Sequence, residues 1–190
     1  MNRRSVLTAA VAAAMTPFSS RLLLAQQSKD GKPTTEKLAP YYPTPELVVE
    51  RMLKLAGLKA GETMFDLGSG DGRIVITAAN KWKANAIGVE FDKDLWQQSS
   101  DRIKKMGLES RAKIIHGDIL KQDYSSADVL TVYLLPLSND KVRPILDRQL
   151  KKGTRIVAHD FEFSDWTPIK TEDIDDDGEG RSHRLYLYQR

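Results

Sequence analysis

The stretch Thr63–Arg73 combines one acidic residue, Asp66, with three glycines spaced two apart. The run Met64–Leu67 is apolar except for Asp66, which predicts a buried parallel strand. Gly68, Gly70 and Gly72 then allow a tight turn and let a ligand approach without a Cβ in the way. A helix beginning near Arg73 would offer unpaired N–H groups to an anionic group of that ligand.

The glycine spacing narrows the identity of the ligand. A dinucleotide fingerprint would need glycine where Arg73 stands, and a P-loop would need a following Gly-Lys-Ser/Thr. The carboxylate of Asp66 suits a ligand that carries an ammonium group. S-adenosylmethionine (SAM) has an ammonium, a carboxylate and a sulfonium, so we expect SAM here, with Ser69 and the three glycines among its contacts. A glycine turn in a solvent-exposed loop is the alternative.

Two more acidic residues follow predicted strands. Glu90 ends the apolar run 86–89 and lies 24 residues after Asp66, a position suited to accept both ribose hydroxyls of a nucleoside. Asp118 follows the run 113–116 and is predicted to accept from an adenine amino group, with Ile119 against the ring. A solvated strand-end glutamate is the alternative for Glu90.

The elements that must position these residues alternate between strand and helix. Thr44 is a candidate N-cap and Pro45 a candidate first residue for a helix that Gly57 ends. Further predicted segments are a helix over 94–106, a strand over 127–133, a strand over 155–158 and two terminal apolar runs. Another helix is predicted from Ser138 or Asn139 to Leu150, and Pro144 marks either a kink in it or its true start. This order predicts an α/β fold with a mostly parallel sheet and an antiparallel edge, where ligands bind at the carboxyl ends of the strands.

The chain gives little sign of a metal site. Asp173, Asp175 and Asp177 have the spacing of the first half of a calcium loop, but Arg181 and Arg184 occupy later ligand positions, so a hairpin turn is the better prediction. His116 is predicted to be a structural strand-end histidine, and no metal site is expected.

Composition excludes several classes of protein. The 190 residues are 41% hydrophobic, enough for one domain with a core, and the absence of cysteine excludes disulfides and thiolate chemistry. The net charge of +3 comes from Arg3, Arg4 and Arg21, because the rest of the chain holds 26 basic and 26 acidic residues. A broad nucleic-acid-binding face is therefore not expected.

The N-terminus resembles an export signal. Arg3-Arg4 precedes the short apolar run 6–15, and Ala25 is a plausible cleavage position, which predicts a twin-arginine-like signal over 1–25. A polar linker is predicted over 26–40, with no membrane span in the mature chain. A cytoplasmic protein is the alternative. Export is hard to reconcile with SAM, which is made in the cytoplasm.

Over about Tyr41–Pro168, the chain resembles the class I seven-strand SAM-dependent methyltransferases, and more closely the group of archaeal and mitochondrial protein-lysine methyltransferases, which predicts a methyltransferase domain over 41–190. The motifs that carry the resemblance are Tyr42-Pro43-Thr44-Pro45, Asp66–Arg73, Gly88-Val89-Glu90, Gly117-Asp118, Val132-Tyr133-Leu134-Leu135 and Arg155–Phe161. The resemblance implies a Rossmann-like sandwich and a protein lysine acceptor.

For the chemistry, we expect Tyr133 and Leu134 to be the catalytic residues that line the methyl-transfer mouth, with Trp166 as a wall. Tyr41 and Tyr42 are expected at its entrance, where Tyr42 is also predicted to contact the cofactor. No residue stands out as a base, so water is the predicted proton acceptor. A methyltransferase for RNA or a small molecule, and an exported non-catalytic SAM-binding protein, are the alternatives.

Overall fold

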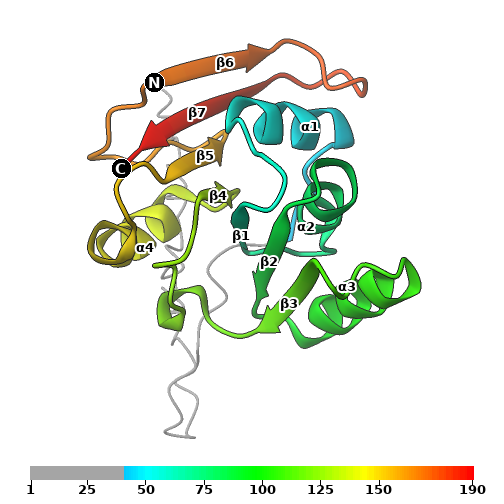
Figure 1. Ribbon diagram of the computed structural model, residues 1–190. Coiled ribbons are helices and arrows are strands. Elements are labelled where there is room, and N and C mark those ends of the chain that lie inside the picture. Colours follow the sequence, from blue (N-terminus) through cyan, green and yellow to red (C-terminus); the bar gives the residue numbers. More distant parts are fainter. Residues whose placement is uncertain (1–40) are drawn as a thin grey trace, which may run out of the picture. The chain divides into compact units, whose positions relative to one another are not determined.

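The computed structural model describes residues 41–190, so the predicted export signal (1–25) and linker (26–40) lie outside the described residues. Residues 41–190 form a seven-stranded sheet with the strand order β3-β2-β1-β4-β5-β7-β6 (Figure 1). The strands are β1 (Thr63–Leu67), β2 (Asn85–Glu90), β3 (Ala112–His116), β4 (Val129–Val132), β5 (Arg155–His159), β6 (Lys170–Ile174) and β7 (His183–Gln189).

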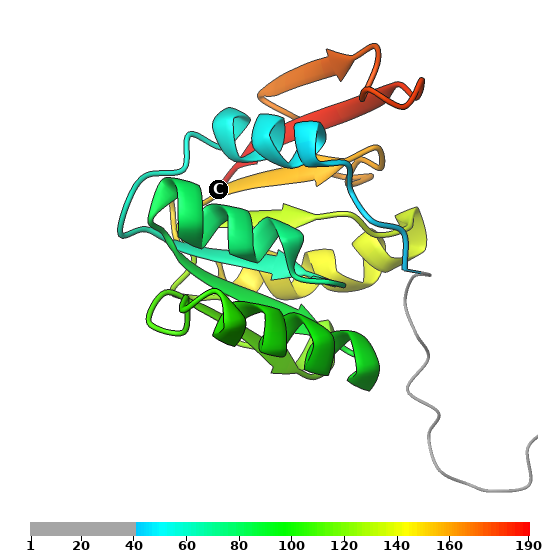
Figure 2. The ribbon, with the colours of Figure 1, turned by 90° about the vertical axis from the view of Figure 1, so that its right-hand side faces the viewer.

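Helices cover both faces of this sheet (Figures 1 and 2). They are α1 (Glu46–Leu55), α2 (Arg73–Thr77), the π-helix η1 (Ala78–Trp82), α3 (Lys93–Lys105), the 3-10 turn η2 (Ile119–Lys121) and α4 (Pro136–Gln149). The first three α-helices pack on one face and α4 on the other (Figure 2), giving a separate apolar core on each side. Across residues 41–190, every helix is too short or too polar to cross a membrane.

The strand directions confirm the predicted sheet. β1 lies parallel to β2 and β4, while β3 and β5 extend the parallel sheet outward. β7 is antiparallel to both β5 and β6, so it lies between them rather than at the margin. Asp66 and Glu90 therefore fall at one edge of the sheet, because parallel strands end on the same side.

Two predicted helix starts are wrong. Thr44 does not cap α1: it is buried, with Oγ1 3.4 Å from Nδ1 of His159, and Pro45 occupies the N-cap position. α4 begins at Pro136, whose fixed φ suits a first helical turn, and it continues through Pro144.

The acidic segment between β6 and β7 is a hairpin, as predicted. Asp177 is buried at its turn, and its Oδ1 accepts from the backbone N–H groups of Glu179 (2.8 Å) and Arg181 (3.2 Å). The carboxylate of Asp177 thus stabilises the turn itself.

Candidate active site

The glycine loop between β1 and α2 has the backbone conformation that its sequence predicts. Gly68, Gly70 and Gly72 all have positive φ, at 77°, 54° and 75°, which a side chain would strain. A Cβ on Gly70 would lie 2.6 Å from the ring of Tyr41, so this aromatic ring closes directly over the loop. The loop therefore depends on glycine for both conformation and space.

Ser69 offers a polar group that the rest of the described chain leaves unused. Its side chain is buried, and Oγ has no hydrogen-bond partner among residues 41–190. A Cβ on Gly88 of β2 would lie 2.5 Å from this Oγ, so the small residue at 88 makes room for it. A buried hydroxyl without a partner is costly unless a ligand supplies one.

Glu90 joins the end of β2 to the glycine loop. Its Oε2 accepts from the N–H of Gly70 at 2.7 Å, and its Oε1 accepts from the N–H of Asp92 at 2.7 Å. Each carboxylate oxygen keeps a further lone pair, so ribose hydroxyls can still donate to it. The side chain is buried, which fixes its orientation before a ligand arrives.

Asp66 lies at the centre of the site, at the end of β1. It is only 3% exposed, and the hydroxyl of Thr131 on β4 donates to its Oδ1 at 2.7 Å. Burial raises the pKa of Asp66 to about 7, against the lowering effect of Thr131, and the nearby charge of Glu90 raises it further. Such a buried, protonatable carboxyl is better suited to a cationic ligand group than to water.

An ion pair between Arg73 and Asp71, which the sequence did not indicate, stabilises the glycine loop. The guanidinium of Arg73 donates to both carboxylate oxygens of Asp71, and its Nη1 donates to the carbonyl of Thr44 at 2.9 Å. The Tyr-Pro-Thr-Pro segment is thereby joined to the glycine loop. The sequence pattern showed Arg73 only as a departure from the dinucleotide fingerprint.

Asp118 lies where a strand-end acid is expected, and it also has a structural role. Its Oδ1 accepts from the N–H of Leu120 at 2.8 Å and so caps η2, while its Oδ2 lies 3.7 Å from Nζ of Lys121. Ile119 is buried in the core beside α4. Binding of an adenine amino group by Asp118 stays a prediction.

Of the two residues predicted to line the methyl-transfer mouth, Tyr133 is half-buried beside His159 and Leu134 is buried against the glycine loop. Tyr133 follows β4. Its ring centroid lies 3.9 Å from that of His159, with the two planes tilted by 34°, and its hydroxyl donates to Oδ2 of Asp160 at 3.3 Å. Burial, followed by the charge of Asp160, raises the pKa of Tyr133 to about 12, so its hydroxyl stays protonated. Leu134 is buried, and a Cβ on Gly68 would lie 3.1 Å from it, so it supports the glycine loop.

Two more aromatic residues were predicted around the mouth: the entrance role of Tyr42 stays a prediction, and the wall role of Trp166 is wrong. Tyr42 is 54% exposed, and its hydroxyl contacts the guanidinium of Arg181. Trp166 does not form a wall of the mouth, because its ring packs against Phe163 and Tyr188. Tyr188 pairs with Ile156 near the start of β5, which places Trp166 toward the opposite edge of the sheet.

A cluster of two histidines and an aspartate adjoins Tyr133, and no sequence pattern indicated it. β7 is antiparallel to β5, so the start of β7 meets the end of β5, where Leu185 pairs with His159. His183 therefore contacts His159, with Nδ1 2.9 Å from Nε2, and both rings are buried. Burial lowers the pKa of His159 to about 4, so its ring is neutral at pH 7.

The geometry fits SAM at the carboxyl edge of β1 and β2. Asp66 can bind an ammonium, Glu90 can accept from ribose hydroxyls, and Ser69 holds an unused hydroxyl beside the loop. His116 ends β3. Its Nε2 contacts the carbonyl of Phe91 at 3.1 Å and its ring stacks on Trp96, contacts that suit the structural role predicted for it.

Known proteins are similar to this chain in sequence. Residues 66–170 match the model of the ANTKMT methyltransferase domain. A protein-lysine N-methyltransferase from Saccharolobus islandicus is 41% identical over 150 residues, which cover 78% of this chain and 92% of that protein. The adenine nucleotide translocase lysine N-methyltransferase of Mus musculus is 28% identical over 149 residues, which cover 78% of this chain and 62% of the mouse protein.

Solved structures agree. An RNA methyltransferase from Salinibacter ruber, crystallised with S-adenosyl-L-homocysteine, has a TM-score of 0.73 and 42% identity, covering 78% of this chain and 93% of that chain. A B. subtilis tRNA methyltransferase has a TM-score of 0.60 at 19% identity, covering 74% of this chain and 65% of that chain. The second likeness concerns the fold alone.

Proposed function

The chain belongs to the ANTKMT methyltransferase domain family and is a SAM-dependent methyltransferase, and we propose that its acceptor is a lysine side chain of a protein. The observation that carries this proposal is the sequence similarity to the Saccharolobus islandicus enzyme, which is named as a protein-lysine N-methyltransferase. The similarity extends over 92% of that protein.

The site residues suit an amine acceptor. Bound SAM supplies an electrophilic methyl group on its sulfonium, so the protein must chiefly align the acceptor nitrogen with that methyl. A lysine amine is mostly protonated at pH 7, and reaching its neutral form costs about 4.6 kcal/mol. An apolar surrounding lowers that cost, because it disfavours the ammonium.

Tyr133 can orient the amine. Its hydroxyl proton is directed to Asp160, so the oxygen lone pairs are free to accept an N–H from the acceptor. This contact would leave the nitrogen lone pair directed at the methyl group. Asp160 acts through Tyr133 in this scheme and is a positioning residue.

The acceptor class is tested by labelling. The full chain is incubated with methyl-labelled SAM and with protein or RNA fractions, including exported proteins, from the source organism. We expect label in protein, and mass spectrometry should place it on lysine. Label in RNA alone would overturn the proposal and favour the activity for which the Salinibacter ruber protein is named.

Replacing Tyr133 with phenylalanine should separate alignment from cofactor binding. We expect kcat for lysine methylation to fall by about 10- to 100-fold, which corresponds to about 1.4–2.7 kcal/mol, while the Kd for SAM changes by less than about twofold. Single-turnover kinetics and calorimetry measure the two quantities. Tyr186→Phe, on β7, is the matched control. Equal losses of kcat and SAM affinity would contradict the role given to the hydroxyl.

We also propose that residues 1–25 direct export, on the strength of Arg3-Arg4 and the apolar run that follows. The acceptor would then lie outside the cytoplasm, which is why exported proteins belong in the labelling experiment.

A further inference from the structure

Three potential ligand atoms lie together beside Tyr133: Nε2 of His159, Nδ1 of His183 and Oδ2 of Asp160. The two nitrogens are 2.9 Å apart, and the carboxylate oxygen lies 3.0 Å from His183 and 3.4 Å from His159. Two ligands about 2.0 Å from a tetrahedral ion lie about 3.3 Å apart, so the three atoms have nearly the separation that such an ion requires.

The outer nitrogen of each histidine has its own partner. Nε2 of His183 lies 3.2 Å from Oδ2 of the buried Asp177, and Nδ1 of His159 lies 3.4 Å from Oγ1 of Thr44. Metal-binding histidines usually donate their second ring N–H in this way, which fixes the tautomer and aims the other nitrogen at the ion. From the sequence alone, Asp177 was predicted to lie in a hairpin turn and Thr44 to cap a helix, and neither was expected to contact a histidine.

With one choice of histidine tautomers, the cluster needs a cation among its inner atoms. If His159 and His183 each donate an outer N–H, both inner nitrogens present lone pairs, and Asp160 adds a negatively charged oxygen. Three electron-rich atoms at 2.9–3.4 Å repel one another unless a proton or a metal ion lies among them.

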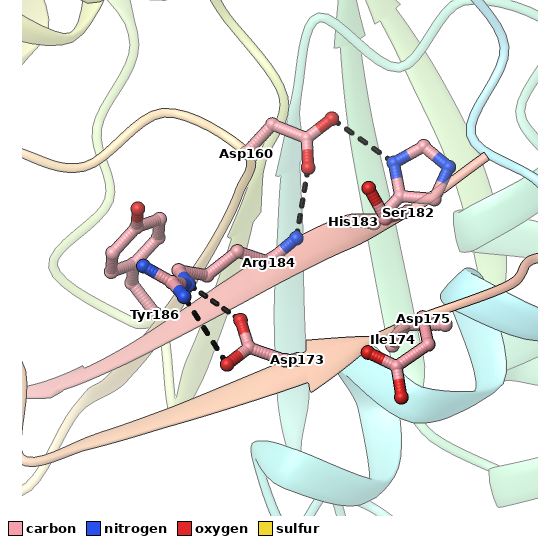
Figure 3. A pocket seen from close by; sticks show the side chains of 8 residues that line it. All are labelled: Asp160, Asp173, Ile174, Asp175, Ser182, His183, Arg184 and Tyr186. Atoms are coloured by element: carbon pink, nitrogen blue, oxygen red, sulfur yellow. Dashed lines mark hydrogen bonds and ion pairs between the residues drawn. The ribbon is translucent and has the colours of Figure 1, made fainter.

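The setting of Asp160 suits a metal ligand. Its φ of 58° is in the left-handed region, and two hydrogen bonds to β7 hold this conformation. The N–H of Asp160 donates to the carbonyl of Arg184. The N–H of Arg184 donates back to Oδ1 of Asp160 (Figure 3). Oδ2 is left facing the histidines.

A pocket adjoins the cluster. Asp160 and His183 line a pocket of about 490 Å³, together with the carboxylates of Asp173 and Asp175 (Figure 3). Arg184, whose guanidinium contacts Asp173, is the cation among the lining residues. The pocket thus reaches two of the three candidate ligand residues, while His159 lies buried behind them.

We propose that His159, His183 and Asp160 bind one divalent transition-metal ion of the zinc class. Two imidazoles and one carboxylate favour zinc or a neighbouring transition metal over magnesium or calcium, which prefer oxygen ligands. Oδ2 of Asp160 also accepts from the hydroxyl of Tyr133, so a bound ion would fix the residue that positions the acceptor. This last effect rests on the proposed function, whereas the metal site does not.

Zinc titration of the full, tag-free chain tests the site after a chelator has removed bound metal. We expect one zinc per chain by calorimetry, a rise in Tm on adding zinc, and a visible absorption spectrum typical of nitrogen and oxygen ligands when cobalt replaces zinc. His159→Asn and His183→Asn should each weaken zinc binding at least 100-fold. Asp177→Asn should weaken it by about 10- to 100-fold, as expected for a partner of a ligand.

The third histidine supplies the matched control. His116→Asn should bind zinc like the wild type, because His116 lies at the end of β3 and contacts Phe91 and Trp96. Circular dichroism of every variant shows whether it is folded. An absence of zinc binding by the wild type, or equal binding by folded His159→Asn and His183→Asn variants, would overturn the proposal and assign a proton to the cluster. The experiment measures metal binding, not methyl transfer. A chain that fails to methylate lysine can therefore still bind zinc, and the two proposals are tested separately.

Discussion

Replacing Glu90 with glutamine is expected to raise the Kd for SAM by at least about 100-fold, which corresponds to about 2.7 kcal/mol. The carboxylate accepts from two backbone N–H groups at once, those of Gly70 and Asp92. A glutamine of the same size must place its NH₂ group against one of these donors, and it can no longer accept fully from the ribose hydroxyls. Hydrogen bonds to a charged group contribute about 1.5–3 kcal/mol each, so several such losses add to a large effect. Calorimetric titration of SAM measures it.

Glu109→Gln is the control for this experiment, since Glu109 is exposed between α3 and β3, at the opposite end of the strands. Its Kd for SAM should equal that of the wild type. An unchanged Kd in Glu90→Gln would mean that the ligand does not engage the end of β2.

Replacing Asp66 with asparagine should move affinity and stability in opposite directions. The variant should lose at least about 100-fold in SAM affinity, because the ammonium loses its buried carboxylate partner. Without SAM, the same variant should unfold at a higher temperature than the wild type at pH 8. The reason is that the wild type must keep a buried charge whose formation the site opposes.

The direction follows from the pKa. Burial raises the pKa of folded Asp66 to about 7 from an ordinary value of 3.8, so the folded chain binds this proton more tightly than the unfolded chain. Stability contributed by this group is therefore full below about pH 4, declines as the pH rises to about 7, and stays low above it. The difference corresponds to at most about 4 kcal/mol, reduced by the cost of burying the new amide.

Thermal unfolding between pH 5 and pH 8, with and without SAM, measures this balance. SAM should raise the Tm of the wild type but not that of Asp66→Asn. Wild-type affinity should also weaken below pH 7, as Asp66 becomes protonated. Asp101→Asn, an exposed position on α3, controls for the loss of one charge. A lower Tm for Asp66→Asn than for the wild type at every pH would show that the buried charge of Asp66 does not destabilise the folded chain.

The sequence by itself determined the half of the site that is local. Asp66 and the glycines lie in one short stretch, where a strand, a turn and a helix start are all encoded by neighbouring residues. Glu90 could be added because parallel strands joined by helices end at the same edge. The same reasoning correctly predicted the sheet, while it placed the start of α4 too late, because a proline can begin a helix or interrupt one.

Only the tertiary structure decided the part of the site whose residues come from strands far apart in the sequence. His159 and His183 are 24 residues apart and follow no spacing rule, and they meet only because β7 inserts antiparallel between β5 and β6. Trp166 was misplaced for the same reason, since its position depends on which end of β7 it packs against. Local sequence specifies strands and turns, but the partner and direction of a terminal strand depend on burial summed over the whole sheet.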